Sequence, residues 1–246
     1  MDDVTAAKML IGLLDLTSLN PDDNSDRIEK LCRRAVTPYG NVAAVCVYSR
    51  FVSQAKRLVA PQGIKVATVV NFPAGGHNFT ELTREIQVAL NNGADEIDAV
   101  LPYKSLIGGD IETCETFFRL LQSEVSAQKI PVKVIIESGE LKTPSLIVAA
   151  SRMCIDNGMN FIKTSTGKTP VSATPEAANL ILETIASGRR NIGLKASGGI
   201  KKLEDAKKYL ILAGAVMGWK WVCPKNFRIG ASSLLDDLLQ TIERGY

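Results

Sequence analysis

The sequence predicts an α/β protein, a single-domain (β/α)₈ barrel with a short N-terminal helix. Strand-like and helix-like segments alternate along the whole 246-residue chain, at about 30 residues per repeat, which is typical of such barrels. Most of the strand-like segments are near-continuous apolar runs. That pattern is typical of parallel strands that are covered on both faces.

Eight segments have the composition of strands. In chain order they are Leu13–Thr17, Ala43–Tyr48, Lys65–Asn71, Glu96–Leu101, Val132–Glu137, Phe161–Ser165, Gly193–Ala196 and Phe227–Ala231. Eight strands with intervening helices are the number that closes this barrel.

Helical patterns lie between these strands. They cover Asp22–Ala35, Asn78–Asn92, Thr143–Asn157, a segment that starts at Thr174, Leu203–Ala213 and Ser232–Arg244. Two of them stop directly before a glycine, Gly93 and Gly158, a common helix stop signal. Thr174 followed by Pro175 places a capping residue before a proline at the first helical position.

An open, doubly wound sheet is the alternative fold. It is disfavoured because no G-x-G-x-x-G motif follows the first strand and no G-x-x-x-x-G-K-[ST] motif occurs. No linker-like, repeated or low-complexity segment interrupts the chain. We therefore expect one domain over residues 1–246.

Composition narrows the possible functions. The chain is 46% hydrophobic and 22% charged, with a formal net charge of +3, and it carries no basic run of the kind that binds nucleic acid. No run of 18 apolar residues predicts a membrane span, and the polar start predicts no signal peptide. We expect a cytoplasmic protein, because its scattered cysteines do not form a disulfide framework. These are Cys32, Cys46, Cys114, Cys154 and Cys223.

Two lysines occupy unusual positions. Lys163 and Lys195 each lie in a short, mostly uncharged strand that runs into a glycine-containing loop. Lysine is a poor strand former and is rarely buried without a partner. A buried amine with a lowered pKa is the nucleophile that forms a Schiff base with a carbonyl compound.

Strand alternation brings further polar residues to the same interior. If the inward faces hold Lys163 and Lys195, the neighbouring strands place Asp98 and Lys133 there too. The alternative is structural, in which inward lysines simply pair with carboxylates, as we expect for Lys133 with Asp98 or Glu137. Barrel enzymes carry their reacting groups at the carboxyl ends of the strands, where these loops begin.

A simple estimate supports the nucleophile. Lysine must lose about three pKa units to be neutral at pH 7, or about 4 kcal/mol. A second ammonium group about 4 Å away supplies about that much at an effective dielectric constant near 20, and burial acts in the same direction. The residues do not rank Lys163 and Lys195, so either is the candidate nucleophile on these grounds.

Two loops predict a phosphate site. Gly198 and Gly199 follow the seventh strand and leave their backbone N–H groups accessible. Ser232 and Ser233 follow the eighth strand and open a helix, whose N-terminus favours an anion. The alternative is that one of these serines only caps that helix.

Eight stretches from the first strand to the last resemble deoxyribose-phosphate aldolases, a class I, Schiff-base aldolase family. They are LDLTSLN (14–20), AAVCVY (43–48), VVNFP (69–73), GADEID (93–98), VIIESGEL (134–141), FIKTSTGK (161–168), KASGG (195–199) and GASSLL (230–235). The lysine-bearing stretch is highly specific, whereas the glycine and serine pairs alone are weak signals.

The resemblance implies a role for each matching residue. It makes Lys163 the Schiff-base lysine, Lys195 the lysine that perturbs it, and Asp98 the proton-relaying acid. Substrate and phosphate positions are Thr166, Gly167, Lys168, Gly198, Gly199, Ser232 and Ser233. Cavity-lining positions are Asp15, Asn20, Cys46 and Lys133. Tyr246, at the end of the chain, is a candidate proton donor on a mobile tail, although a frayed terminus is the commoner fate.

The implied reaction is reversible cleavage of 2-deoxy-D-ribose 5-phosphate to D-glyceraldehyde 3-phosphate and acetaldehyde, as in deoxyribonucleoside catabolism. It implies sugar phosphates and aldehydes as partners, no metal or other cofactor, no nucleic acid or membrane partner, and a homodimer or higher homo-oligomer. Two alternatives stay open: another class I aldolase or transaldolase, and a non-catalytic barrel that binds a sugar phosphate.

Overall fold

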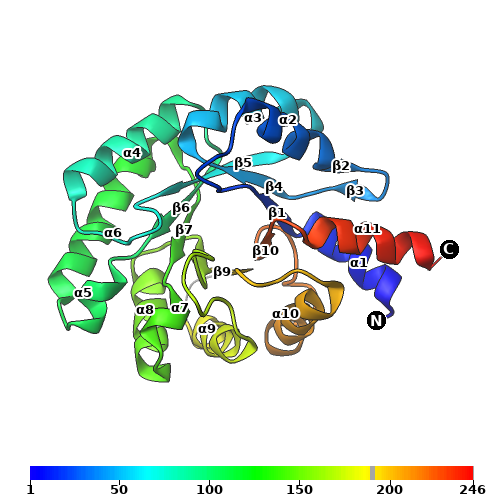
Figure 1. Ribbon diagram of the computed structural model, residues 1–246. Helices are drawn as coiled ribbons and strands as arrows, with labels where there is room; N and C mark the ends of the chain where they lie inside the picture. The colour runs from blue at the N-terminus through cyan, green and yellow to red at the C-terminus, as the bar shows by residue number, and fades with distance from the viewer. Residues whose placement is uncertain (189–191, 246) are drawn as a thin grey trace.

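In the computed structural model, which describes residues 1–188 and 192–245, eight parallel strands close into a barrel inside a ring of helices (Figure 1). Around the barrel the order is β1, β10, β9, β8, β7, β6, β5 and β4, and β4 pairs with β1 to close the ring. The strands are β1 Leu14–Thr17, β4 Ala44–Val47, β5 Lys65–Val70, β6 Glu96–Val100, β7 Val132–Ile135, β8 Phe161–Lys163, β9 Gly193–Ser197 and β10 Phe227–Ala231. The predicted fold class is therefore confirmed.

Each barrel strand overlaps one of the eight predicted segments, and the differences lie at the ends. The last strand has the predicted bounds, but β8 stops at Lys163, two residues earlier than predicted. The strand before it, β7, also stops two residues early, because Glu137 takes a left-handed backbone conformation with φ of 52°. A two-stranded hairpin, β2 (Val36–Thr37) and β3 (Gly40–Asn41), lies outside the barrel sheet.

Helices cover the outside of the barrel (Figure 1). They are α1 Asp3–Gly12, α2 Ser25–Arg34, α3 Val52–Val59, α4 Phe79–Asn91, α5 Tyr103–Ile107, α6 Ile111–Val125, α7 Ser138–Leu141, α8 Pro144–Asp156, α9 Pro175–Ser187, α10 Leu203–Met217 and α11 Leu234–Arg244, with 3₁₀ turns η1 Ser49–Phe51, η2 Ala60–Gln62 and η3 Ser126–Gln128. The N-terminal helix packs beside the C-terminal helix, as Figure 1 shows. No helix of the described ranges is long and apolar enough to cross a membrane.

Two helices of eight or more residues are missing from the sequence prediction, α3 and α6, along with the short helices α5 and α7. The first has no side-chain cap at its start, so the usual start signal is absent. The second does carry a signal, since the Asp110 side chain accepts a hydrogen bond from the Thr113 backbone. Helix α10 also runs four residues beyond its predicted end, to Met217.

Strand alternation separates the apolar core from the polar interior. On β9, Leu194 and Ala196 belong to the large apolar core cluster, while Lys195 between them faces the other way and is fully buried. The same alternation turns Lys163 on β8 and Asp98 on β6 inward. Parallel strands share one carboxyl end, so the loops that follow these residues meet at the same mouth of the barrel.

Candidate active site

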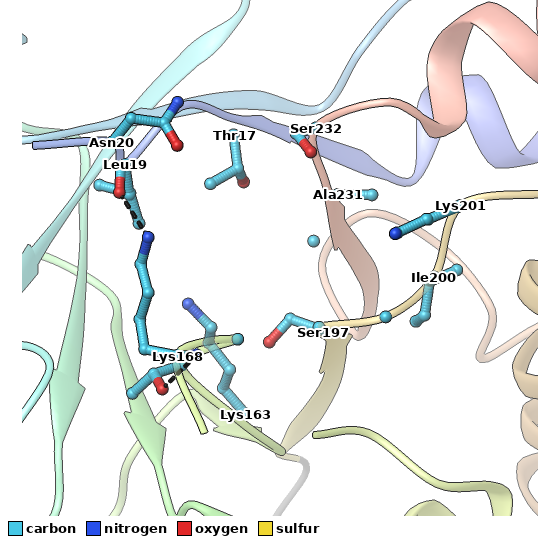
Figure 2. A pocket seen from close by; sticks show the side chains of 15 residues that line it. Thr17, Leu19, Asn20, Lys163, Lys168, Ser197, Ile200, Lys201, Ala231 and Ser232 are labelled. Carbon is cyan, nitrogen blue, oxygen red and sulfur yellow. Dashed lines mark hydrogen bonds between the residues drawn. The ribbon is translucent and has the colours of Figure 1, made fainter. Parts of the chain in front are cut away.

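A cavity of about 280 Å³ opens at the carboxyl ends of the strands. Its lining is Thr17, Leu19, Asn20, Lys163, Thr166, Gly167, Lys168, Ser197, Gly198, Gly199, Ile200, Lys201, Gly230, Ala231 and Ser232. Figure 2 shows Lys163 and Lys168 on one side of the cavity, with Lys201 and Ser232 across from them. Residues from four chain segments, at the ends of β1, β8, β9 and β10 and in the loops after them, therefore form one concave site.

Lys163 stands at the floor of this cavity. It is the last residue of β8 and lies in register with Lys195 of β9. Lys163 is 3% exposed and lines the cavity, whereas Lys195 is fully buried and does not. Lys163 is therefore the lysine of this pair that an incoming carbonyl compound would meet.

Asp98 lies at the centre of three lysine side chains. Lys163 and Lys195 each donate a hydrogen bond to its Oδ2, at 2.8 Å and 2.7 Å. Lys133 donates to the other oxygen, Oδ1, at 2.7 Å. Because Lys163 and Lys195 share the Oδ2 acceptor, their nitrogens are no farther apart than the sum of those two distances.

A second carboxylate, Asp15, lies below this centre. Its Oδ2 lies 2.6 Å from the Lys195 Nζ and 3.8 Å from the Lys133 Nζ. Lys133 also lies 2.7 Å from Glu96. The expected pairing of Lys133 with Asp98 is thus present, and Glu137, the other partner considered, takes different partners.

The two lysines in register have opposite electrostatic environments. Burial lowers the pKa of Lys163; Asp98 opposes that effect, and the Lys195 ammonium adds to it. Burial also acts to lower the pKa of Lys195, but Asp15 and Asp98 outweigh it and raise that pKa. Burial, rather than the neighbouring ammonium, is the larger cause for Lys163, which reverses the order in our estimate from the sequence.

Asp98 is held as a carboxylate. Burial acts to raise its pKa, but Lys133, Lys163 and Lys195 together hold the pKa well below its usual value. An ionised carboxylate at this point orients the amine beside it. A neutral, oriented primary amine at the floor of a cavity is able to condense with an aldehyde or ketone.

The far side of the cavity is suited to an anion. Gly198 and Gly199 have φ of 89° and 81°, conformations that favour glycine. Ser232 lies on the lining near the start of α11, so the positive end of that helix points toward this region. Lys201, which we did not single out from the sequence, also lines the cavity here.

Ser233, unlike Ser232, is not among the lining residues. It occupies the N-cap position of α11, yet its side chain makes no capping hydrogen bond. Helix α11 begins at Leu234, two residues later than predicted, which leaves both serines in the preceding turn.

A buried glutamate holds the loop that follows β8. Glu137 accepts hydrogen bonds from the Thr166 hydroxyl at 2.5 Å and from the Thr166 backbone N–H at 3.3 Å. Thr169 donates a further one at 3.3 Å. The loop carries Gly167 and Lys168 into the lining, and Lys168 donates to the Leu19 carbonyl at 2.8 Å. This contact joins the loops after β8 and β1 across the mouth.

The remaining predicted cavity residues lie at two depths. Asn20 is on the lining, whereas Cys46 is fully buried beneath it in a small apolar cluster with Leu19, Ala67 and Val69. Burial raises the pKa of the Cys46 thiol, which keeps it in the unreactive form. Tyr246 lies outside the described residues.

Sequence reasoning missed several lining residues: Thr17, Leu19, Ser197, Ile200, Lys201, Gly230 and Ala231. Each is one of the last two residues of a barrel strand or lies within four residues after a strand, so position alone was an available signal. No group of three or more histidine, cysteine, aspartate or glutamate side chains suited to a metal ion occurs within residues 1–188 and 192–245.

Comparisons with known proteins agree with the fold described above. A family model described as DeoC/LacD family aldolase matches residues 9–240. A proposed deoxyribose-phosphate aldolase from Coccidioides immitis has a similar structure, with a TM-score of 0.85 and 27% sequence identity over 96% of this chain and 86% of that one. The family-model match spans all eight barrel strands.

Two further structures are similar. A proposed deoxyribose-phosphate aldolase from Toxoplasma gondii ME49 matches with a TM-score of 0.85 and 25% identity, over 98% of this chain and 95% of that one. A tetrameric deoxyribose phosphate aldolase from Aeropyrum pernix matches with a TM-score of 0.72 and 22% identity, over 100% of this chain and 98% of that one. The last likeness bears on the fold alone.

Proposed function

The chain belongs to the DeoC/LacD aldolase family, and we propose that it reversibly cleaves 2-deoxy-D-ribose 5-phosphate to D-glyceraldehyde 3-phosphate and acetaldehyde. One observation carries the proposal. Lys163 faces a cavity whose opposite side is suited to an anion, and Asp98 and Lys195 lie directly beneath it. The proteins from C. immitis and T. gondii, named for this activity, support the substrate.

In the proposed reaction the neutral Lys163 amine attacks the C1 aldehyde of the open-chain sugar. Loss of water gives an iminium ion, which accepts the electron pair of the C2–C3 bond when that bond breaks. The C3 hydroxyl loses its proton in the same step, and D-glyceraldehyde 3-phosphate leaves. Protonation of the remaining enamine at carbon, followed by hydrolysis, releases acetaldehyde and restores the amine.

Asp98 is the group we assign to proton relay, through a water molecule. Since its pKa is held well below its usual value, it orients that water and passes the proton on rather than retaining it. Lys195, with its raised pKa, stays an ammonium group. Its charge disfavours a second positive charge on Lys163 before the substrate binds.

The phosphate is assigned to the opposite side of the cavity. Gly198, Gly199 and Ser232 would bind it with backbone and hydroxyl donors, and Lys201 would contribute positive charge beside them, while Lys168 would contribute positive charge from the Lys163 side. Thr166 and Gly167 complete this end. A phosphate held there places the sugar chain between the anion site and Lys163.

Borohydride trapping tests the proposal. Reduction in the presence of 2-deoxy-D-ribose 5-phosphate is expected to fix a covalent adduct on Lys163, which peptide mapping would locate. Binding of the sugar phosphate without any trapped adduct would instead indicate a non-catalytic sensor. An adduct without release of acetaldehyde would point to a different aldolase or transaldolase.

We also propose that the protein is cytoplasmic and forms a homodimer or higher homo-oligomer. Five free cysteines among the described residues suit a reducing compartment. Light scattering during size-exclusion chromatography would test the assembly, and a particle with the mass of one chain would contradict it.

A further inference from the structure

A column of buried charges runs down the inside of the barrel, from the substrate cavity toward the opposite end. We call it the charge column, and its members are Glu96, Arg228, Asp15, Lys133, Lys195, Asp98 and Lys163. Its upper part is the site already described. Its lower end, Arg228 and Glu96, belongs to no part of the reaction described so far.

Arg228 is held on several sides. One terminal nitrogen lies 2.5 Å from the Asp15 Oδ1, and the other lies 2.9 Å from the Glu96 Oε1. The Nε donates to the Pro224 carbonyl at 2.5 Å, and the guanidinium lies 5.8 Å from the centre of the Phe161 ring. Arg228 is 5% exposed and lines a second cavity of about 650 Å³, not the substrate cavity.

A continuous set of contacts connects this guanidinium to the amine in the substrate cavity. Arg228 contacts Asp15, and Asp15 lies 2.6 Å from Lys195. Lys195 and Lys163 then share the Oδ2 of Asp98, at 2.7 Å and 2.8 Å. Arg228 thus fixes the carboxylate that holds Lys195, without touching the cavity itself.

The charge column is electrically neutral only when one of its basic side chains has lost its proton. Each of its three carboxylates lies within 4 Å of at least two cations, so we take all three as ionised. Four basic side chains face them, one more than balance requires. Among the described residues, Lys163 has one carboxylate within that distance, whereas Arg228, Lys133 and Lys195 each have at least two. Of these four side chains, Lys163 therefore loses its proton at the lowest free-energy cost.

We propose that Arg228 is a positioning residue for this reaction, and that its buried charge, transmitted through Asp15 and Lys195, keeps Lys163 a neutral amine. At the lower end of the column, the negative charge of Glu96 opposes the effect of the Arg228 charge. This inference rests on the proposed function for its consequence in catalysis, but the charge balance is a property of the free protein.

The groups that face the two ends complete the balance. The groups around Lys163 are Asp98, Lys195, Cys46 and, just after β7, Glu137. The carboxylates around Arg228 are Asp15 and Glu96. Both of these carboxylates also contact Lys133. Removing the Arg228 charge leaves a surplus of negative charge, which favours the ammonium form of Lys163. Removing the Glu96 charge leaves a surplus of positive charge, which favours the amine.

The test removes the charge of Arg228, of Glu96 or of both, the two partners of one ion pair. Arg228→Gln, Glu96→Gln and the double variant are compared with the unmodified protein. The rate at which formaldehyde and cyanoborohydride methylate Lys163, followed by peptide mapping across a pH series, reports the neutral fraction without any sugar substrate. The pH profile of kcat/KM for 2-deoxy-D-ribose 5-phosphate is recorded in parallel.

We expect the labelling midpoint to rise by roughly one pH unit in Arg228→Gln and to fall by a similar amount in Glu96→Gln, the size that a unit charge on the order of 10 Å away produces at an effective dielectric constant near 20. The double variant restores the balance and returns the midpoint close to its starting value. A packing role for this ion pair would move the two single variants in the same direction.

Shifts of equal sign, no shift in either variant, or a double variant with no return toward the starting value would overturn the inference. If Arg228→Gln does not fold, as judged by thermal melting, Glu96→Gln alone decides, and any result other than a lower midpoint is contrary. Arg34→Gln is the control, because Arg34 pairs with Asp236 at the surface; a shift as large as that of Arg228→Gln would also be contrary. If the labelling shifts appear but the unmodified protein leaves the sugar phosphate intact, the proposed function fails while the charge balance stands.

Discussion

Three lysines on neighbouring strands of this barrel have different electrostatic environments. Lys133 contacts three carboxylates, Lys195 contacts two, and Lys163 contacts one. All three are buried, so the number of carboxylate partners, rather than burial itself, separates them. The lysine with the fewest partners is also the one at the cavity, and this coincidence makes it the candidate nucleophile.

Lys163→Leu is expected to lower the cleavage rate by at least about 10,000-fold, because the amine that forms the covalent intermediate is lost. Steady-state assays and borohydride trapping would both measure the loss. Lys207→Leu is a matched control, since Lys207 pairs with Asp3 outside the barrel. A cleavage rate in Lys163→Leu close to that of the control would falsify the assignment.

Lys195→Leu is expected to move the acid limb of the kcat/KM profile upward by about one to two pH units. The Lys195 ammonium lowers the pKa of Lys163, so its removal raises that pKa and leaves less amine at neutral pH. Cleavage at pH 7 then falls, while part of it returns at higher pH. A slower enzyme with an unmoved acid limb would exclude this role and leave a purely structural one.

At the scale of elements, the end of β7 determines the shape of the next loop. Glu137 takes a left-handed backbone conformation at that point and turns its carboxylate toward Thr166 and Thr169. Burial raises the pKa of Glu137, and the hydrogen bonds from Thr166 oppose that effect. The loop from Thr166 to Lys168 therefore depends on a residue that does not line the cavity.

Glu137→Gln is expected to raise KM for the sugar phosphate by roughly ten-fold, with kcat changed by less than about two-fold, because one charge-assisted hydrogen bond to the loop is worth about 1.5–3 kcal/mol. Initial rates over a substrate series would separate the two constants. Glu140→Gln is the matched control on α7, outside the cavity lining. A fall in kcat with KM unchanged would show that Glu137 acts on the chemical step instead.

The whole molecule carries a charge cluster where most barrels of this kind are filled with branched apolar side chains. Buried charges stabilise a fold only while their partners stay ionised. The acidic members, Asp15 and Asp98, both have a lowered pKa in the folded protein. Stability is therefore expected to depend on pH in a window that these two groups define.

Asp15 and Asp98 contribute stability above their unfolded pKa, near 3.9, and that contribution is lost as pH falls toward their lower folded pKa values. We expect the free energy of unfolding to drop by about 1.4 kcal/mol per pH unit for each carboxylate below that point. Lys163 adds a slope of the same sign at higher pH, since its lowered pKa means that the unfolded chain binds more protons there.

Urea unfolding at fixed ionic strength between pH 5 and pH 2.5 would measure this loss. Repeating the series at higher salt is the control, because salt screens exposed charges far more than buried ones. An unfolding midpoint that stays constant down to pH 3, or a loss of stability that disappears at higher salt, would contradict this prediction.

Much of this arrangement is predictable from short stretches of sequence. The eight strands follow from apolar runs, and the inward positions of Lys163, Lys195, Lys133 and Asp98 follow from alternation along each strand. The missed helix α3 lacks a capping signal, and the missed lining residue Lys201 looked like one of many surface lysines. Arg228 carried the same signal as the lysines, a charge within an apolar strand, but was not singled out.

The sequence by itself determined which residues face the inside of the barrel, because side-chain alternation is a property of each strand alone. The tertiary structure decided how many carboxylates each cation meets, because those contacts join residues far apart in the chain. Asp98 and Lys163 are separated by 65 positions, and Asp15 and Arg228 by 213. Proton affinity in a buried interior depends on those short-range contacts, so the lowered pKa that separates Lys163 from Lys195 arises only when the strands close into a ring.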